Sequence, residues 1–162
     1  MWGVIGNRRI RQAVRALVVD DAWNTLLVRL QFPAWSGWVL PGGGIGEGEG
    51  VEAALHRELA EELGIVGAHV TGPIWRRTVL WGGEGEFAGQ SEQIYLLRSA
   101  RFDPTPQLPW EVLAAEGVTD LRWWSPVELA NCEETLAPSR LAELVTELAK
   151  NGVPRSVLDV GE

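Results

Sequence analysis

Residues 43–65 read GGIGEGEGVEAALHRELAEELGI, and this stretch decides how the middle of the chain folds. Its second half predicts an α-helix, because aliphatic residues recur at four-residue steps, at Val51, Leu55, Leu59 and Leu63. Gly64 follows the last of them, and glycine is typical of a helix C-terminus. The glycines of the first half predict a loop. A glycine-rich loop followed by a helix therefore forms the centre of the predicted fold.

Three glutamates, Glu58, Glu61 and Glu62, lie within two turns of this predicted helix, next to Arg57. On a helical wheel of roughly 100° per residue they span an arc of about 100°. Like charges at this spacing destabilise a helix, and two partly buried carboxylates at ~4 Å repel each other by about 4 kcal/mol. Glu62 lies at the margin of the apolar stripe, where a carboxylate needs an ion pair or a bound metal. A hard divalent cation would supply the compensating charge; a solvated helix face with pairs such as Arg57–Glu61 is the simpler alternative.

The loop before the helix favours a metal site over a solvated helix face. Six glycines fall between Gly42 and Gly50. Backbone without side chains can approach a ligand closely and offer its amides or carbonyls. A helix that begins just after such a loop also presents the positive end of its dipole to a phosphate. The loop and the glutamates together favour a site for a metal ion and a phosphate.

At these residues the chain resembles a known family. The spacing Gly43, five residues, Glu49, seven residues and then RELAEELGI resembles the Nudix box at every constrained position. The lead-in from Trp38 to Gly43 is also similar, and so is the later segment from Trp124 to Leu129. The resemblance implies an α/β fold, a Nudix-type α/β/α sandwich with a central mixed sheet, formed as a single domain by residues 1–162. It also implies a hydrolase that uses Mg²⁺ or Mn²⁺ to cleave a diphosphate linkage in a nucleoside diphosphate linked to another moiety.

The resemblance assigns roles to the residues of the box. It implies four metal-binding positions, namely Gly42, Glu58, Glu61 and Glu62. Gly42 would contribute its carbonyl, and Glu58 or Glu61 would be the general base that activates water. Arg57 would orient the glutamates through charge-assisted hydrogen bonds. Glu49 would support the loop or the start of the helix.

In similar proteins an extra base or metal ligand comes from a loop beyond the box. Here that loop is expected at Trp81–Glu92, which is acidic and rich in glycine, and it offers Glu84, Glu86 and Glu92. Glu92 is the foremost of the three, because it immediately precedes a predicted strand that would return toward the metal. The simpler interpretation of each residue is an exposed acidic loop position.

Substrate contacts are expected from arginines and tryptophans. Arg29, Arg76 or Arg77 would bind phosphate, and at most one of the last two can face the site, because neighbouring strand residues point to opposite faces. Base stacking would come from an aromatic ring, which accepts any base, at Trp35, Trp38 or Trp81. Trp38 suits the core equally well.

The remaining pattern predicts strands and helices that alternate, as in α/β or α+β proteins. Strands are expected at residues 13–19, 25–30, 74–80, 93–97 and 121–124, the first two joined as a hairpin through the turn Asp20–Asn24. Residues 102–117 are expected to be an irregular connection. Ser125 opens a predicted short helix with a capping box, and residues 141–150 are expected to form the last helix.

Composition limits the class of function. The net charge of −8 argues against general nucleic-acid binding, which needs a basic surface. Cys132 is the only cysteine, which excludes an internal disulfide. No apolar run reaches membrane-spanning length, and the segment from Met1 to Arg15 lacks a signal-peptide pattern. We therefore expect a cytoplasmic protein that does not act at a membrane. The family resemblance implies a small-molecule nucleotide diphosphate as its partner, and a monomer and a homodimer both stay open.

The identity of the substrate is not determined at this point. Leu80 stands where proteins similar to ADP-ribose hydrolases carry a proline, and no tyrosine marks a dinucleoside polyphosphate hydrolase near Trp81. A nucleoside triphosphate or a nucleotide sugar remains the broadest expectation. Two alternatives belong to other classes: a non-catalytic nucleotide-sensing module of the same fold, which would be expected to lack box glutamates, and an isopentenyl diphosphate isomerase, which would need a cysteine near the lead-in.

Overall fold

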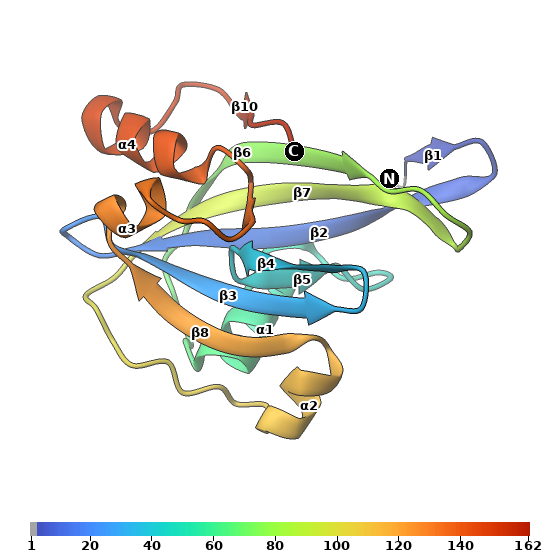
Figure 1. The fold of residues 1–162 in the computed structure, drawn as a ribbon, viewed down its shortest axis with the longest axis horizontal. Coiled ribbons are helices and arrows are strands. Elements are labelled where there is room, and N and C mark those ends of the chain that lie inside the picture. The colour runs from blue at the N-terminus through green and yellow to red at the C-terminus, as the bar shows by residue number, and fades with distance from the viewer. Residues whose placement is uncertain (1–2) are drawn as a thin grey trace.

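The computed structural model describes residues 3–162, so the first two residues of the predicted domain lie outside the described part (Figure 1). Ten strands in this part form one mixed sheet: β1 (Val4–Ile5), β2 (Arg8–Val19), β3 (Thr25–Phe32), β4 (Trp35–Val39), β5 (Gly42–Gly44), β6 (Thr71–Leu80), β7 (Phe87–Arg98), β8 (Val118–Trp124), β9 (Leu136–Ala137) and β10 (Leu158–Asp159). Four helices accompany it: α1 (Val51–Leu63), α2 (Trp110–Ala115), α3 (Pro126–Ala130) and α4 (Leu141–Asn151). The strand order is β10-β6-β7-β2-β3-β4-β9, with β1 and β5 also paired to β2 and β8 paired to β3.

The centre of the sheet is the parallel pair of β2 and β7. Both faces of β2 are buried, which is why its second half reads as a continuous aliphatic run. One face of the strand, with Val14, Ala16 and Val18, packs against α1. The other face, with Leu17 and Val19, belongs to a core shared with α3 and α4. The sheet therefore lies between helices on two sides, and the predicted α/β/α sandwich with a mixed sheet is confirmed.

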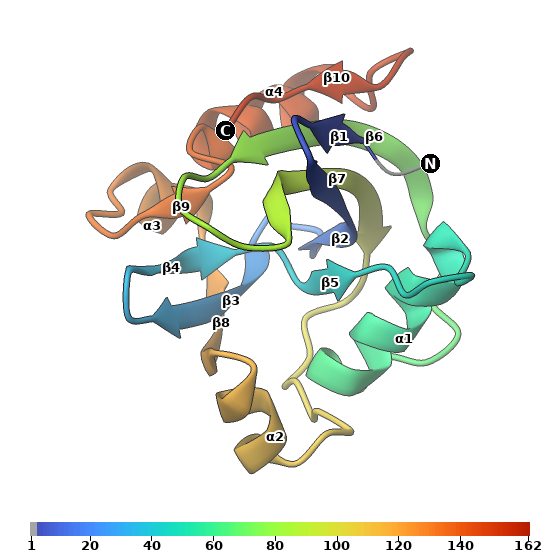
Figure 2. The ribbon, with the colours of Figure 1, turned by 90° about the vertical axis from the view of Figure 1, so that its right-hand side faces the viewer.

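The sheet is strongly curled. Figure 2 shows β6 and β7 on one side of the curl and β3, β4 and β5 on the other, with α1 packed outside β5. Strand β5 leaves the β3–β4 hairpin and pairs antiparallel with β2, where Gly42 lies opposite Arg15. The chain then passes through the glycine-rich loop into α1. This path brings the start of the loop and one face of α1 to the inside edge of the curl.

Helix α1 matches its prediction from the sequence. Leu55, Leu59 and Leu63 are buried on the face that meets the sheet. Gly64 ends the helix in the left-handed conformation at φ 74°, and its N–H donates to the carbonyl of Ala60. The predicted hairpin between β2 and β3 and the Ser125 cap of α3 are also confirmed.

Two predicted elements differ from the structure. Strand β7 begins at Phe87, so the expected loop at 81–92 shrinks to a turn at 81–86. Residues 89–92 pair with β2 on one side and β6 on the other, but they are small or polar and carry no apolar alternation that would reveal a strand. Within the expected irregular connection 102–117, Trp110–Ala115 form helix α2, which starts directly after Pro109.

In residues 3–162 no helix combines the length and the apolar character needed to cross a membrane.

Candidate active site

A pocket of about 890 Å³ lies inside the curl of the sheet. Its volume falls in the range typical of small-molecule sites. Two sets of side chains line it, and they differ in chemistry. The charged and amide set is Arg11, Arg15, Arg57, Glu58, Glu62, Arg77, Gln90, Glu92 and Glu116, joined by the glycines of β5 and the loop. The apolar and aromatic set is Val28, Leu30, Phe32, Trp35, Val39, Ile45, Val79, Trp81, Phe87, Val118 and Ala137.

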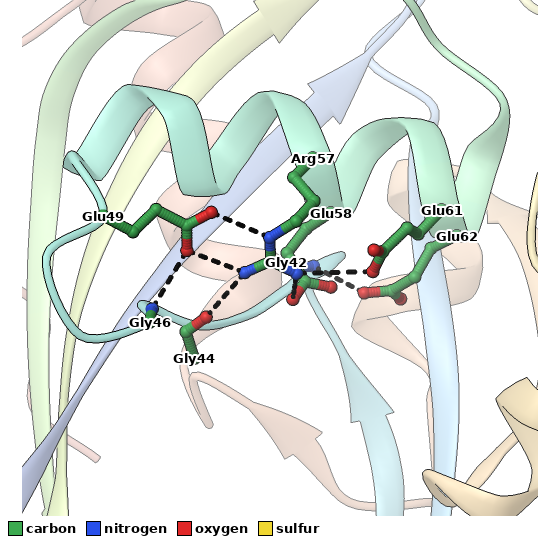
Figure 3. Close-up of polar contacts among 8 residues, drawn as sticks. All are labelled: Gly42, Gly44, Gly46, Glu49, Arg57, Glu58, Glu61 and Glu62. Carbon is green, nitrogen blue, oxygen red and sulfur yellow. Dashed lines mark hydrogen bonds and ion pairs between the residues drawn. The ribbon is translucent and has the colours of Figure 1, made fainter.

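The acidic cluster, Glu58, Glu61 and Glu62, projects from α1 (Figure 3). Glu58 and Glu62 line the pocket, and only 5% of Glu62 is exposed. Burial and the nearby charge of Glu58 raise the pKa of Glu62 to about 8. Burial also raises the pKa of Glu58, although Arg57 opposes this shift. Two adjacent carboxyl groups with raised pKa values form a site in which a bound cation would stabilise the ionised carboxylates.

Arg57 connects this cluster to the loop (Figure 3). Its Nε and Nη2 donate to the two carboxylate oxygens of Glu49, at 2.8 and 2.9 Å. Its Nη1 donates to Glu58 Oε1 at 2.8 Å and to Glu61 Oε2 at 3.3 Å. The hydrogen bonds from Arg57 hold the pKa of Glu49 at about 2, and Glu49 in turn accepts from the N–H of Gly46. The guanidinium thus orients two glutamates while Glu49 fixes the loop.

Glu61 and Gly42 lie differently from Glu58 and Glu62. Glu61 contacts Arg57 and does not line the pocket. Gly42 lines the pocket, and its N–H donates to Glu62 Oε1 at 3.2 Å. Within residues 3–162 no three acidic, histidine or cysteine side chains form a ready-made cage for a metal ion. The site offers two adjacent carboxylates and backbone, and this donor set leaves room for water and substrate oxygens.

Two glycines of β5 are required by close contacts with these side chains. A Cβ at Gly43 would lie 2.6 Å from Glu58 Oε1. A Cβ at Gly44 would lie 2.5 Å from Arg11 Nη2. A larger residue at position 43 would therefore displace the Glu58 carboxylate, and one at position 44 would displace the Arg11 guanidinium. The glycines of the box make space for functional side chains at these positions.

A second charged group surrounds Glu92 on β7. Glu92 is 2% exposed and accepts from Arg15 Nε and Gln90 Nε2, both at 2.8 Å, while Arg77 Nη1 lies 3.3 Å away. Burial opposes ionisation of this carboxyl, but Arg15, Arg77 and the two hydrogen bonds outweigh it and hold the pKa of Glu92 below its ordinary value. Glu92 is therefore a buried carboxylate already neutralised by two arginines.

Some of the residues predicted to bind substrate line the pocket, and others lie outside it. Arg77 and Trp81 line the pocket. Arg76 points to the opposite face of β6 and pairs with Asp159 at 3.5 Å, so one arginine of the two faces the site, as expected. Arg29 pairs with Glu134 at 3.3 Å and does not line the pocket.

Three further expectations are corrected by the structure. Trp38 is 3% exposed, packs edge-on against Trp124 and donates its indole N–H to Glu134, so no base can stack on it. Glu84 lies in the exposed turn at 81–86 and does not line the pocket. Glu86 in the same turn pairs with Arg9 instead of reaching the acidic cluster. The longer strand β7 carries both glutamates away from the pocket and leaves Glu92 among its lining residues.

Sequence reasoning missed four polar residues of the pocket, Arg11, Arg15, Gln90 and Glu116. Arg15 carried a signal, because it is the one charge inside a buried aliphatic run at residues 13–19. A buried arginine in a strand needs a carboxylate partner, and the pairing of β2 with β7 supplies Glu92. Arg11 and Gln90 gave no such signal, since both occur in stretches that read as ordinary polar surface.

Comparison with known proteins agrees with this fold. The family model of the NUDIX domain matches residues 9–148, so the chain belongs to the NUDIX family. Nudix hydrolase 25 of Arabidopsis thaliana is a relative that is 37% identical over 95 residues, which cover 51% of this chain and 52% of that protein. The chain thus spans about half the length of that relative.

Two solved structures illustrate the likeness. The MutT protein from Methanosarcina mazei Go1 superposes with a TM-score of 0.66 at 17% identity, over 91% of this chain and 100% of that one. The NUDIX domain of Shewanella oneidensis NrtR, in complex with ADP ribose, superposes with a TM-score of 0.65 at 20% identity. The superposition covers 86% of this chain and 88% of that one. These likenesses show a common fold, and the predicted Nudix-type architecture is confirmed.

Proposed function

We propose that this protein is a divalent-metal-dependent hydrolase that cleaves a diphosphate linkage in a nucleoside diphosphate joined to another moiety. The observation that carries this proposal is the pair of adjacent carboxylates of Glu58, which is partly buried, and Glu62, which is buried; the pair shares one pocket with Arg77. The carboxylates favour a cation and the guanidinium favours phosphate, so the pocket suits a metal-bound diphosphate. Membership of the NUDIX family supports the same reaction.

The residues of the site fit Mg²⁺ or Mn²⁺. Mg²⁺ keeps several waters and is commonly held by one or two carboxylates plus substrate phosphates, not by a closed protein cage. Glu58 and Glu62 match this pattern, and we propose that Glu61 and the Gly42 carbonyl complete the set. When bound, the ion would lower the pKa of a water molecule and stabilise negative charge on the phosphate oxygens. Arg57 holds Glu58 and Glu61 in place for this role.

Glu58 and Glu61 are the side chains that we propose as general base for the attacking water. Glu92 suits that role less well, because the charges of Arg15 and Arg77 help to hold its pKa low despite its burial. A carboxylate with a low pKa accepts a proton poorly at neutral pH. We propose instead that Glu92 positions the two arginines.

The apolar set of the pocket suits the nucleoside. In the β3–β4 hairpin, Phe32 pairs with Trp35 and Val28 with Val39, so their side chains share one face. Trp81 follows β6 and also lines the pocket. Trp35 and Trp81 are 39% and 42% exposed and so present ring surface on which a base can stack. Stacking on such rings discriminates weakly among bases, and we therefore propose that the base is held mainly by shape.

A hydrolysis screen tests the proposal. Wild-type protein is incubated with Mg²⁺ or Mn²⁺ and with nucleoside triphosphates, nucleotide sugars, dinucleoside polyphosphates and ADP-ribose, and products are identified by mass. Two variants of α1 accompany it, Glu62→Gln in the pocket and Glu52→Gln, which alters an exposed glutamate of the first turn. We expect Glu62→Gln to lower turnover by on the order of a hundredfold and Glu52→Gln to leave it unchanged.

Two outcomes would contradict the proposal. Full metal-dependent activity in Glu62→Gln would refute the metal assignment. Absence of cleavage for every substrate, with folded protein that still binds nucleotides, would favour the alternative of a non-catalytic nucleotide-sensing module.

A further inference from the structure

Glu116 is a carboxylate of the pocket whose acceptor oxygens are unused in the described part of the chain. Among residues 3–162, four glutamates line the pocket. Glu58, Glu62 and Glu92 each accept a hydrogen bond from a neighbouring residue. The carboxylate of Glu116 accepts no hydrogen bond and forms no ion pair with any residue from 3 to 162. An ionised carboxylate can only accept hydrogen bonds, so Glu116 is available to a ligand that donates them.

Glu116 belongs to the apolar end of the pocket. The other charged residues of the lining come from β2, α1, β6 and β7. Glu116 follows α2 and precedes β8, and the pocket residues of β3, β4 and β8 are all apolar or aromatic. Figure 2 shows α2 below β3 and β4, whereas α1 lies to the right of both. The glutamate is therefore separated from the acidic cluster and lies at the end of the pocket that suits the nucleoside.

The backbone holds Glu116 close to an aromatic ring. Its N–H donates to the carbonyl of Leu113 at 3.0 Å, and the carbonyl of Gly117 accepts from the N–H of Gln31 at 2.9 Å. Gly117 has a φ of 91°, and a Cβ there would lie 2.5 Å from Phe32 Cε1. Glu116 is thus fixed one residue away from the contact with Phe32, so its side chain can reach the edge of a base that stacks beside this ring.

The position of Glu116 gives no evident gain in stability. The residue is the C-terminal cap of α2, and the carbonyl end of a helix disfavours a negative charge. No cation from residues 3–162 pairs with it. A charge that opposes the local preference without a compensating contact is expected at functional positions. Glu116 therefore fits a ligand contact better than a structural role.

The bases differ in what they offer to a carboxylate. Guanine carries two adjacent donors, N1–H and the 2-amino group, which match the two oxygens of a carboxylate as a guanidinium does. Adenine and cytosine place a ring nitrogen acceptor beside their amino group, and uracil places a carbonyl on each side of its N–H. These acceptors would lie against the negative oxygens. Guanine is therefore the base that a free carboxylate favours.

We propose that Glu116 is a specificity-determining residue that selects guanine by accepting hydrogen bonds from N1–H and the 2-amino group. This inference rests on the proposed function and names the base of its nucleotide substrate. Stacking on Phe32 and Trp35 holds a base of any kind, and Glu116 decides which base is preferred.

Binding of three mononucleotides in saturating Mg²⁺ tests this role without any catalytic step. GMP, IMP and AMP contain no diphosphate linkage, and IMP differs from GMP only in lacking the 2-amino group. Dissociation constants are measured by calorimetry for wild type, Glu116→Ala, Glu116→Gln and Glu111→Gln. Glu111 is the matched control, because it is an exposed glutamate of α2 that does not line the pocket.

We expect wild type to bind GMP about fivefold to thirtyfold more tightly than IMP, the discrimination that a bidentate contact to a base provides. Glu116→Ala should bind GMP and IMP equally, because the acceptor is gone. Glu116→Gln should bind AMP more tightly than wild type does, since an amide can donate to N1 of adenine and accept from its amino group. Glu111→Gln should keep the wild-type preference. A merely structural role of Glu116 would change the affinity for all three nucleotides alike.

Several results would overturn the role of Glu116. They are equal affinity of wild type for GMP and IMP, an unchanged preference in Glu116→Ala, the same loss of preference in Glu111→Gln, and no binding of any of the three nucleotides. The hydrolysis screen keeps this role separate from the proposed function. Wild type that prefers GMP through Glu116 but cleaves no nucleotide would refute the hydrolase and support the role of Glu116. Cleavage of GTP and ITP with equal kcat/KM would overturn the role of Glu116 alone.

Discussion

Replacing Glu62 by glutamine should change how the stability of the metal-free protein depends on pH. Glu62 is almost fully buried beside Glu58, and its pKa rises from 4.5 to about 8 because burial and Glu58 outweigh the attraction of Arg15. The folded state therefore favours the protonated carboxyl. The stability that this provides is fully present below pH 4.5 and is lost as the pH rises through about 8.

The size of the effect follows from the shift. At ~1.4 kcal/mol per pKa unit, the change corresponds to about 5 kcal/mol of unfolding free energy, shared with Glu58 because the two groups titrate as a pair. A domain is stabilised by only about 5–15 kcal/mol in total. The metal-free wild type should therefore be much less stable at about pH 9 than at about pH 5. Glutamine cannot ionise, so Glu62→Gln should show little of this dependence.

Urea denaturation in a chelator, at several pH values, measures this free energy directly. Glu52→Gln serves as control and should follow wild type, since Glu52 is exposed on the same helix. Adding Mg²⁺ at high pH should restore stability to wild type but much less to Glu62→Gln, because binding to the folded state requires the ionised pair. A wild-type stability that does not change with pH, or a Glu62→Gln variant that keeps the full pH slope, would refute the assigned burial and charge of this site.

Three further substitutions give distinct outcomes. Glu92→Gln should destabilise the protein by about 3–5 kcal/mol in urea denaturation, because Arg15 then stays buried without its carboxylate. Gly43→Ala should lower Mg²⁺ affinity by about tenfold to a hundredfold in calorimetry, with folding retained, because the new Cβ would displace the Glu58 carboxylate from its position. Trp35→Ala should raise KM for a nucleotide substrate by about fivefold to a hundredfold with little change in stability, since a stacked base is worth about 1–3 kcal/mol.

Each of these variants has a matched control. Glu86→Gln alters an exposed glutamate near β7 and should change stability little. Gly46→Ala adds a Cβ whose nearest neighbour lies at 3.4 Å, and it should keep normal Mg²⁺ affinity. Trp110→Ala removes a half-exposed ring from α2 outside the pocket and should leave KM unchanged. A variant that behaves like its control would disprove the corresponding interaction.

Local sequence was sufficient for the elements in which neighbouring residues interact. Helix α1 follows from an aliphatic stripe and a terminal glycine, and the hairpin of β2 and β3 follows from the turn at Asp20–Asn24. The box also predicted that Glu58 and Glu62 lie together, because residues four apart on a helix share a face. The hydrogen bonds from Arg57 to Glu58 and Glu61 span at most a few residues along the chain. The acidic side of the candidate site was therefore determined by the sequence alone.

The arginine side of the site was decided only by tertiary structure. Arg11 and Gln90 are 79 residues apart, and Arg15 and Glu92 are 77 apart; they meet because β2 and β7 pair in one register. A shift of one residue would turn these side chains to the other face of the sheet. The same long-range packing buried Trp38, shortened the loop at 81–92 and directed Glu84 and Glu86 away from the pocket. Strand register depends on many distant contacts at once, so no local pattern in the sequence encodes which charges it brings together.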